Sequence, residues 1–414
     1  MRGGQDFNAA RYTAFEVQVI HLTRLKLSGF RNHVDTDINL SPGLVVFTGA
    51  NGHGKSGLLE AVHMLSVGKS LRASNDREIV NHSIARDGGH VQALGVFNNG
   101  PESVRAQFDL EVAPSSAETF SRLNSKTKEW RINGVKVQPV EFVGRANVVI
   151  FEAGDLDLSL GAAAVRRRYL DILIGQFDTE YVQTLVRLNR VRASRNALLR
   201  GSMDVQDFEE EIAFWDGRFC EESVKIIQTR REVMELLQTR SAPIHAELSE
   251  GESLGLRYLP NLGSAARATA STELEGSELR NHVYEALMAS KRKEQSSGHM
   301  VIGPHLDDFR IDIAGAPSRR FASRGQARTA ALSLRLAEAS LVSEFARRDP
   351  IIAFDDVLSE MDSTRRGTVL ERASQYEQTL LTATDDALVD RDRLAGAQNF
   401  RVVRGNVTPA VIPA

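Results

Sequence analysis

The stretch LVVFTGANGHGKSGLLEAVHMLS, residues 44–66, decides the fold class of this chain. Its first five residues are apolar and rich in β-formers, as in a buried strand, and residues 55–66 carry apolar side chains at helical spacing. Between them, residues 49–56 fit the pattern G-x4-G-K-[ST]. A glycine-rich turn is the alternative, but the strand before the pattern and the helix after it predict a phosphate-binding loop in an α/β protein.

The phosphate loop predicts a site for ATP. Its glycines let backbone N–H groups close around phosphate oxygens, and the following helix adds the positive end of its dipole. Lys55 is expected to reach the β- and γ-phosphates, and the Ser56 hydroxyl is expected to hold Mg²⁺. The candidate ATP-binding residues of the loop are Gly49, Ala50, Asn51, Gly52, His53, Gly54, Lys55 and Ser56.

An apolar run that ends in two acids, IIAFDD at residues 351–356, is the expected partner of a phosphate loop. Apolar strands ending in Asp are common, so this pattern indicates a nucleotide site only because it follows the phosphate loop in the chain. Asp355 is predicted to position the Mg²⁺ shell, as a metal ligand beside Ser56. Asp356 is predicted to polarise the attacking water, which makes the two acids the candidate catalytic residues.

Two short polar motifs lie on either side of the acidic strand. Ser323, Gly325 and Gln326 stand at the start of a helix predicted over 327–346, where a hydroxyl and an amide form an anion site. One chain needs only one binding site for a γ-phosphate, so this second anion site indicates a nucleotide held by another copy of the chain. A plain helix cap is the alternative. The carboxylate loop after the strand either faces that partner's nucleotide or caps the next helix, and its candidate residues are Ser359, Glu360 and Asp362.

Length and composition narrow the class of protein further. A chain of 414 residues predicts two or three domains, and its single cysteine excludes a disulfide framework and a multi-cysteine metal site. A net charge of −3 argues against binding nucleic acid through bulk charge. No stretch has the roughly 20 apolar residues of a membrane span, and residues 1–20 lack the apolar core of a secretory signal, so we expect a cytoplasmic protein without a membrane partner.

These motifs, in this order, resemble the ATP-binding-cassette (ABC) class of P-loop ATPases. Within that class, about 21–386 resembles the RecF family of bacterial recombination mediators, and four further segments carry the likeness. They are LSGFRNH at 27–33, GKSLR at 68–72, RRRYLD at 166–171 and GPHLDD at 303–308. This chain departs from the family pattern in three ways. Leu306 replaces an Arg, Arg324 and Ala327 replace Gln residues around the signature, and residues 1–20 have no counterpart.

The resemblance implies an α/β ABC-ATPase head, a P-loop NTPase fold, with a helical second lobe inserted. We expect an N-terminal extension at 1–20, the first part of the ATPase lobe at 21–164, the helical lobe at 165–295 and the second part of the ATPase lobe at 296–414. It also implies an ATP-dependent homodimer that clamps double-stranded or gapped DNA, weak DNA-stimulated ATP hydrolysis, and RecO and RecR proteins as partners. Arg31 and Asn32 are carried over as nucleotide contacts.

Basic clusters offer contacts for DNA phosphates, and the candidates in one helical stretch are Arg187, Arg190 and Arg195. A solvated helix face or local pairing with Glu is the alternative for each of them. Two other functional classes stay open. One is the ATPase subunit of a transport complex, against which the inserted lobe and the LSGFRNH segment count. The other is a nucleotide-gated scaffold without meaningful hydrolysis.

Overall fold

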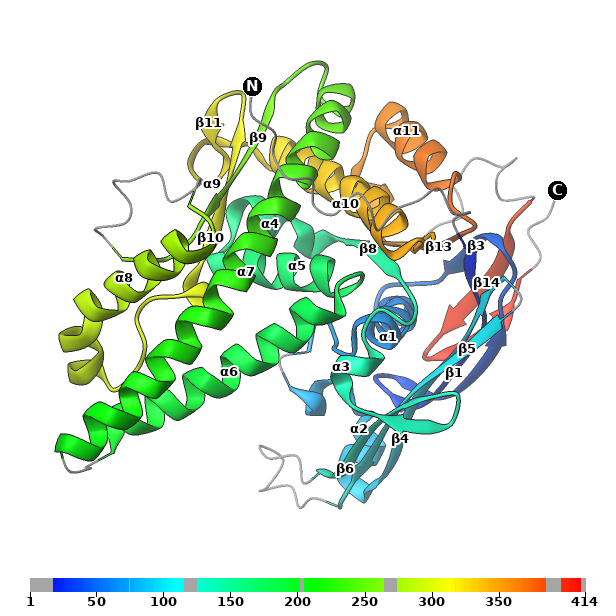
Figure 1. Ribbon diagram of the computed structural model, residues 1–414. Coiled ribbons are helices and arrows are strands. Elements are labelled where there is room, and N and C mark those ends of the chain that lie inside the picture. The colour runs from blue at the N-terminus through cyan, green and yellow to red at the C-terminus, as the bar shows by residue number, and fades with distance from the viewer. Residues whose placement is uncertain are drawn as a thin grey trace. The chain divides into compact units, whose positions relative to one another are not determined.

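The computed structural model describes residues 18–73, 75–100, 102–114, 125–201, 205–263, 274–384 and 396–410. The chain divides into two compact units, which meet along the chain at Asp155/Leu156 and at Leu334/Arg335 (Figure 1). We call the part with the phosphate loop the ATPase unit and residues 156–334 the helical unit. Most of the extension expected at 1–20 lies outside the described residues, which begin at position 18.

The ATPase unit contains a mostly parallel sheet with the strand order β15-β14-β3-β13-β12-β8. Its central strands are apolar runs buried on both faces, as expected where a parallel sheet is covered on each side. Both strands predicted around the phosphate-site motifs, β3 and β12, are present, and β13 lies between them. The strands are β3 (Gly43–Thr48), β8 (Val148–Glu152), β12 (Ile351–Asp355), β13 (Gln378–Ala383), β14 (Gln398–Val403) and β15 (Asn406–Pro409).

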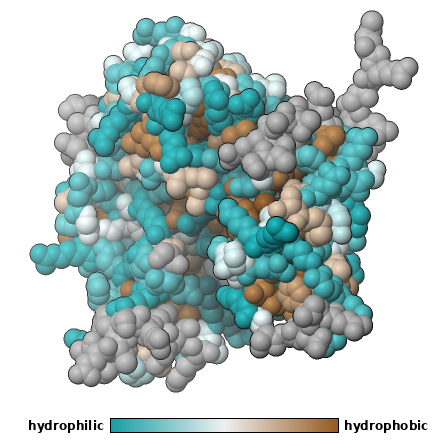
Figure 2. All heavy atoms as spheres, turned by 90° about the vertical axis from the view of Figure 1, so that its left-hand side faces the viewer, coloured by the Kyte–Doolittle hydropathy of each residue, from teal (hydrophilic) through white to brown (hydrophobic). Residues whose placement is uncertain are grey.

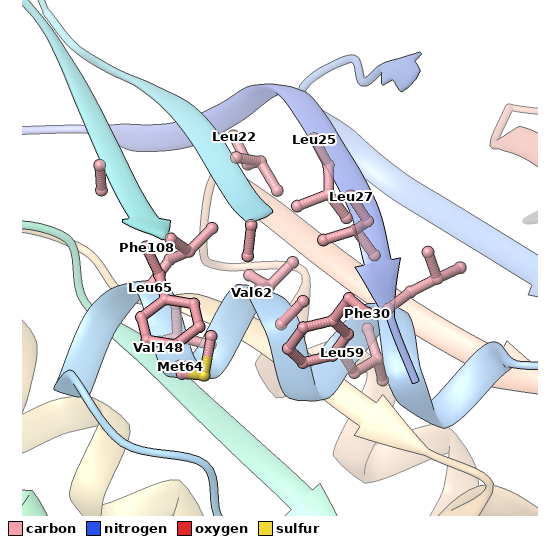
Figure 3. Packing of buried hydrophobic residues seen from close by; sticks show 14 of the residues in the cluster. Leu22, Leu25, Leu27, Phe30, Leu59, Val62, Met64, Leu65, Phe108 and Val148 are labelled. Carbon is pink, nitrogen blue, oxygen red and sulfur yellow. The ribbon is translucent and has the colours of Figure 1, made fainter. Parts of the chain in front are cut away.

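A second sheet of the ATPase unit is antiparallel, with the order β2-β1-β4-β5-β6-β7. Its strands are β1 (Ile20–Phe30), β2 (His33–Asn39), β4 (Gly89–Asn99), β5 (Glu102–Val112), β6 (Ser125–Ile132) and β7 (Val135–Val137). Helix α1 (Lys55–Val67) contacts strands of both sheets. Figure 3 shows Leu59, Val62 and Leu65 of this helix packed beside Leu25 and Phe30 of β1. The core of the unit therefore surrounds the helix that follows the phosphate loop.

Helix α1 differs from the prediction in how much of it is buried. The sequence pattern predicts one apolar face, yet 12 of the 13 residues of the helix are buried, including Glu60 and Ser66. A helix between two sheets has little exposed face, so its polar side chains must find partners inside the protein. This burial explains why a carboxylate from α1, that of Glu60, enters the hydrogen-bond network of the site described below.

The remaining helices of the ATPase unit are short. They are the 3-10 turns η2 (Asp76–Ile79), η4 (Ala153–Asp155) and η7 (Val357–Glu360), and the α-helices α2 (His82–Asp87), α3 (Pro139–Phe142) and α11 (Ser363–Ala373). The long helix α10 (Arg324–Ala346) starts in the helical unit and ends in the ATPase unit. Among the described residues, no helix has the length and apolar character needed to cross a membrane.

The helical unit is built on long helices and one small sheet. Its elements are α4 (Leu156–Leu160), α5 (Ala163–Gly175), α6 (Thr179–Arg200), α7 (Val205–Leu248), β9 (Leu254–Leu259), α8 (Gly276–Ser297), η6 (Pro304–Leu306), β10 (Asp308–Ile313), β11 (Ala316–Pro317) and α9 (Ser318–Phe321). The unit extends further than the lobe expected at 165–295. The reason is that β10, which lies beyond that range, pairs with β9 inside it, and the chain returns to the ATPase unit only within α10.

Two of the segments that carried the family resemblance meet inside the helical unit. Arg166 donates two hydrogen bonds to the Asp308 carboxylate, at 2.7 and 3.0 Å. Arg230 of α7 is buried and donates to both Asp171 (2.8 Å) and Asp307 (3.0 Å). Buried charges are tolerated when they are paired and hydrogen-bonded, so RRRYLD and GPHLDD fold as one ion-pair network. Leu306 takes no part in these ion pairs.

Figure 2 shows one face of the molecule, on which hydrophilic residues predominate and hydrophobic ones occur in scattered groups. Exposed large apolar side chains in the helical unit include Phe214 and Phe321, which are 55% and 69% exposed. Single exposed apolar residues are ordinary on protein surfaces. We therefore assign no function to these groups.

Candidate functional site

The phosphate loop lies between β3 and α1, at the carboxyl end of the parallel strands. Gly52 and Gly54 have φ values of +78° and +116°, which side chains with a Cβ rarely adopt. A Cβ at Gly54 would also lie 2.7 Å from Oδ1 of Asn32. Gly52 is therefore required by backbone conformation, and Gly54 by conformation and by the close approach of Asn32.

Lys55 folds back over the loop that precedes it. Its Nζ donates to the carbonyl oxygens of Gly49 (2.5 Å) and Ala50 (3.2 Å). Burial lowers the pKa of this ammonium, while the nearby charges of Asp356 and Asp355 act to raise it. The structure thus places one cation between the loop and the acidic strand, as a group that recognises nucleotide phosphates needs to be placed.

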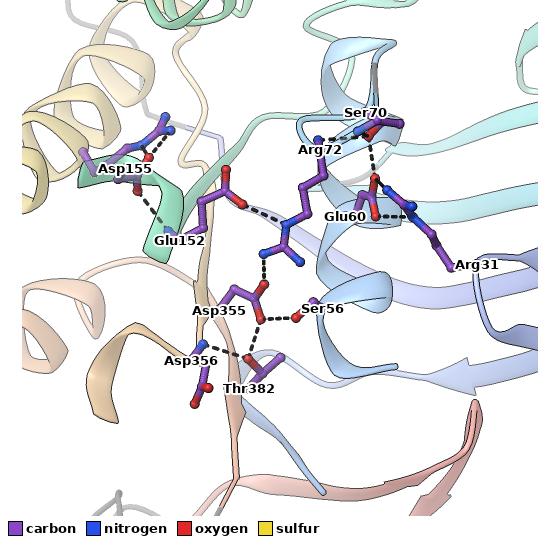
Figure 4. Close-up of polar contacts among 12 residues, drawn as sticks. Arg31, Ser56, Glu60, Ser70, Arg72, Glu152, Asp155, Asp355, Asp356 and Thr382 are labelled. Carbon is purple, nitrogen blue, oxygen red and sulfur yellow. Dashed lines mark hydrogen bonds and ion pairs between the residues drawn. The ribbon is translucent and has the colours of Figure 1, made fainter. Parts of the chain in front are cut away.

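The two residues predicted as metal ligands lie together. The Ser56 hydroxyl donates to Oδ1 of Asp355 at 2.9 Å, and the Thr382 hydroxyl donates to the same oxygen at 2.8 Å (Figure 4). Asp355 is almost fully buried, at 3% exposure. A hydroxyl and a carboxylate are the hard oxygen ligands that Mg²⁺ prefers, so this pair fits that ion.

Arg72 completes the surroundings of Asp355 and has no counterpart among the predicted site residues. Its Nη2 donates to Oδ2 of Asp355, and its Nε donates to Glu152 at 2.9 Å (Figure 4). Burial, helped by the charge of Asp155, raises the pKa of Glu152, and the Arg72 cation opposes that rise. Arg72 belongs to the GKSLR segment noted above, which suggested a family likeness but gave no role.

Asp356 stands beside this pair in a different backbone conformation. Its φ is +56°, in the left-handed region, and its N–H donates to the Thr382 hydroxyl at 3.0 Å. Burial, together with the charges of Asp355 and Glu360, raises the pKa of its carboxyl, while Lys55 opposes the rise. Among the described residues, its Oδ1 has no hydrogen-bond partner. Asp356 also lines the cavity described next, where a carboxylate can serve as the candidate acceptor of a proton from water.

Several of these groups line a cavity of about 1020 Å³. Its lining includes Arg31, Asn32, Arg72, Asp356 and five of the predicted loop residues, namely Asn51, Gly52, Gly54, Lys55 and Ser56. Gly49, Ala50 and His53 are not in that lining: the first two bind Lys55 through their carbonyls, and His53 contacts Val402 at 3.3 Å.

The two residues carried over as nucleotide contacts have internal partners. The Arg31 guanidinium is bound by both carboxylate oxygens of Glu60, at 2.7 and 2.8 Å, and the Ser70 hydroxyl also donates to Glu60. The Asn32 amide donates to the carbonyl of Gly52 at 3.4 Å. Both side chains line the cavity, and both also hold the protein around the loop in place.

The signature motif forms a helix cap at the start of α10. The N–H of Gln326 donates to the Ser323 hydroxyl (3.2 Å), and the N–H of Ser323 donates to the Gln326 side chain (3.0 Å). This reciprocal pair is a capping box, which was the alternative from the sequence. Gly325 accepts a hydrogen bond from Thr329, and the Gln326 amide also donates to Glu252 at 2.7 Å. A role toward another copy is compatible with such a cap and stays a prediction.

The carboxylate loop likewise shows local contacts. Asp362 caps α11 by accepting a hydrogen bond from the N–H of Arg365 at 2.9 Å. The Ser359 hydroxyl donates to the carbonyl of Asp356 at 2.6 Å, and Glu360 is exposed. Asp362 therefore caps the next helix, as one of the two interpretations from the sequence proposed. Ser359 supports the turn that carries Asp356, the candidate general base.

The predicted DNA contacts require a correction. Arg195 is 1% exposed, and its guanidinium binds Asp216 (2.6 Å) and Glu294 (2.5 Å) in the interior of the helical unit. It cannot reach a DNA phosphate while it is buried and paired. Arg187 binds the Glu222 carboxylate at 3.0 Å, and Arg190 is exposed. Arg187 keeps 39% of its side chain exposed but is paired with Glu222, so Arg190 is the candidate that best keeps the surface position that the prediction assumed.

Comparisons with known proteins agree with this arrangement. Residues 21–402 match the family model described as the RecF/RecN/SMC N terminal domain. The DNA replication and repair protein RecF of Roseiflexus castenholzii is 34% identical over 411 residues, covering 94% of this chain and 100% of the relative. The protein of the same name from Herpetosiphon aurantiacus is 33% identical over 398 residues, with the same two coverages.

A solved structure of the recombination mediator protein RecF with ATP, in the RecFOR pathway, is also similar. It has a TM-score of 0.82 at 27% identity and covers 97% of this chain and 100% of that chain. Together with the two sheets and the buried helix α1, this likeness confirms the predicted fold class, an α/β ABC-ATPase head with mixed helices and sheets.

Proposed function

The chain belongs to the RecF family of DNA replication and repair ATPases, and on this premise we propose that it binds ATP with Mg²⁺ in the cavity beside the phosphate loop and hydrolyses it slowly. In the proposed site, backbone N–H groups of residues 51–56 hold the phosphate oxygens. Lys55 moves from its carbonyl contacts to the β- and γ-phosphates. The cavity contains enough converging polar groups to orient a triphosphate.

Mg²⁺ would be held by Ser56 and Asp355, and when bound it supplies positive charge to the phosphates. Thr382 keeps Asp355 oriented through its hydroxyl, and Asp356 accepts a proton from the attacking water. The observation that carries this proposal is the 2.9 Å hydrogen bond between Ser56 and Asp355, two residues 299 positions apart. The fold brings together the hydroxyl and the carboxylate that a magnesium nucleotide requires.

We further propose that two copies of the chain enclose the nucleotide. Ser323, Gly325 and Gln326 of one copy would face the phosphate loop of the other, with Ser359, Glu360 and Asp362 at the same interface. The N-terminus of α10, a helix of 23 residues, supports this role, because N–H groups at a helix start favour an anion. ATP would close the dimer around double-stranded or gapped DNA, and DNA-stimulated hydrolysis would release it.

The relative solved with ATP is described as a recombination mediator in the RecFOR pathway. On that basis we propose that this chain acts in the cytoplasm with RecO and RecR proteins and helps to load recombinase at gaps. Arg190 is the retained candidate for a DNA phosphate contact, because its side chain is exposed.

Light scattering on the Asp356→Asn protein, with ATP and with ADP, tests the shared site. We expect a monomer with ADP and a dimer with ATP, and Lys55→Met should remain a monomer with both nucleotides. A monomer in both states with ATP bound would contradict the shared site. Phosphate release with and without DNA is the companion measurement, and no stimulation by DNA would favour the nucleotide-gated scaffold.

A further inference from the structure

The hairpin of β14 and β15 contacts the phosphate loop through its backbone. The N–H of Gly405, in the turn of this hairpin, donates to the carbonyl of His53 at 2.8 Å. The carbonyl of Val402 lies 3.3 Å from Nδ1 of His53, and a Cβ placed on Gly49 would lie 2.3 Å from the same carbonyl. Gly49 and His53 of the loop therefore lie directly against a hairpin that none of the sequence motifs includes.

His33 adds a side-chain connection between the same two segments. Its ring is fully buried, with Nε2 3.0 Å from the carbonyl of Gly54 and Nδ1 2.9 Å from the carbonyl of Gly405. The hydroxyl of Thr36, a residue of β2, lies 3.1 Å from Nδ1 of His33 and donates to the carbonyl of Gly405 at 3.2 Å. One imidazole thus lies between the last peptide of the phosphate loop and the turn of the hairpin.

We propose that His33 and the Gly405 turn are positioning elements of the ATP site, which hold the phosphate loop in its binding conformation by joining it to the β14–β15 hairpin. The carbonyl of Gly54 also accepts the first hydrogen bonds of α1, from Gly57 (2.9 Å) and Leu58 (3.3 Å). Fixing that carbonyl on the outer side of the loop keeps the neighbouring N–H groups directed at the phosphates. His33 acts through the loop and touches no reacting atom.

The turn itself offers a matched pair of variants. Arg404 and Gly405 have φ values of +49° and +83°, and Asn133 and Gly134, in the turn between β6 and β7, have +50° and +82°. Both are two-residue hairpin turns with positive φ at each central residue. An alanine should cost the same backbone strain at either glycine. The surroundings differ, because a Cβ at Gly405 would lie 2.1 Å from the carbonyl oxygen of Asn32, whereas a Cβ at Gly134 meets nothing within 4 Å.

This inference rests on the proposed function, since it takes ATP as the ligand of the loop. Titration calorimetry with ATP and Mg²⁺, on the full chain well below each variant's unfolding temperature, tests it. We expect Gly405→Ala to weaken ATP binding at least tenfold and Gly134→Ala to change it less than twofold. A role in stability alone would leave the ATP affinity of both folded variants unchanged, because binding is measured well below their unfolding temperatures.

A second variant keeps the test decisive if Gly405→Ala fails to fold. His33→Phe keeps a ring of similar size but removes the ring nitrogens that lie against the Gly54 and Gly405 carbonyls, to one of which a neutral imidazole donates, so we expect it also to weaken ATP binding about tenfold. His33→Gln retains one amide donor and should give an intermediate affinity. Equal ATP affinity in the wild type, Gly405→Ala and His33→Phe would overturn the inference and leave the proposed function standing. A wild-type chain that binds ATP no better than Lys55→Met would overturn both.

Discussion

Arg72 donates a hydrogen bond to Asp355, the carboxylate that also accepts from Ser56. The same guanidinium binds Glu152, whose strand pairs with that of Asp355 so that the two acids are register partners. Two neighbouring carboxylates, one of them nearly fully buried, repel each other unless a cation lies between them. Arg72 supplies that positive charge at the place where a magnesium ion is proposed to bind.

Replacing this cation gives the first prediction. Arg72→Ala should lower the free energy of unfolding of the nucleotide-free protein by about 1 kcal/mol, a modest value because Arg72 is partly exposed. Mg²⁺ and ATP should reduce the difference from the wild type, because the bound metal supplies charge to Asp355. Urea unfolding with and without Mg-ATP measures both effects. A destabilisation that Mg-ATP leaves unchanged would contradict this account.

Ser56 offers a test of the metal contact. In Ser56→Ala the Asp355 carboxylate keeps Thr382 and Arg72 as partners, so the fold should be retained. Loss of the hydroxyl should weaken the Mg²⁺-dependent part of ATP binding about tenfold. Calorimetric titrations with ATP in Mg²⁺ and in a chelator measure how much Mg²⁺ contributes to ATP affinity. The wild type in chelator is the control. If magnesium strengthens ATP binding equally in both proteins, Ser56 is not a ligand.

The Asp356 carboxyl predicts a dependence on pH. Its pKa is raised in the folded protein, so the folded state binds this proton more readily than the unfolded chain does. The associated stability is present below the ordinary value of 3.8 and is lost as the pH rises through the raised pKa. Asp356→Asn should therefore unfold at a higher temperature than the wild type at pH 7, while it stops hydrolysis.

For a general base the ionised form is the active one. Phosphate release by the wild type should fall as the pH drops through the raised pKa of Asp356, and calorimetry should show that Asp356→Asn still binds ATP at pH 7. A turnover rate in Asp356→Asn equal to that of the wild type would remove Asp356 from the mechanism.

Two arginines of α6 should respond oppositely to substitution. Arg195→Ala leaves Asp216 and Glu294 buried without their cation, and should cost about 3–5 kcal/mol of unfolding free energy. Arg190→Ala removes an exposed side chain and should change stability by less than about 0.5 kcal/mol. Urea unfolding measures the first effect. Fluorescence anisotropy with duplex DNA measures whether Arg190 contributes to DNA affinity. An unchanged affinity in Arg190→Ala would exclude Arg190 as a phosphate contact.

The parts of the site that could be predicted from sequence are those fixed by local chemistry. A strand, a glycine-rich turn and a helix follow each other directly in residues 44–66, and an apolar strand ending in acids needs no distant information. Arg72 and Glu152 were missed because their role depends on which strands are neighbours in the sheet. The pairing of β8 with β12 is a tertiary fact that neither segment encodes alone.

Arg195 is a second residue whose surroundings could not be predicted from the local sequence. Arginines at helical spacing look alike in sequence whether they face solvent or a carboxylate of another helix. The partner Glu294 lies 99 positions further along the chain, on α8. Likewise, periodicity indicated one apolar face for α1, whereas enclosure by two sheets buried nearly all of it. Burial that comes from several elements at once cannot be deduced from the pattern of any one of them.

The strand order of the parallel sheet has a consequence for biosynthesis. Strand β3, which leads into the phosphate loop, has β13 and β14 as its two neighbours, and these strands come from residues 378–403. A ribosome that has made the first 350 residues has therefore produced the loop but neither strand that flanks β3. Pairing over so long a separation forms late and slowly. The nascent chain should thus acquire affinity for nucleotide only when translation is nearly complete, and products truncated before β13 should lack it.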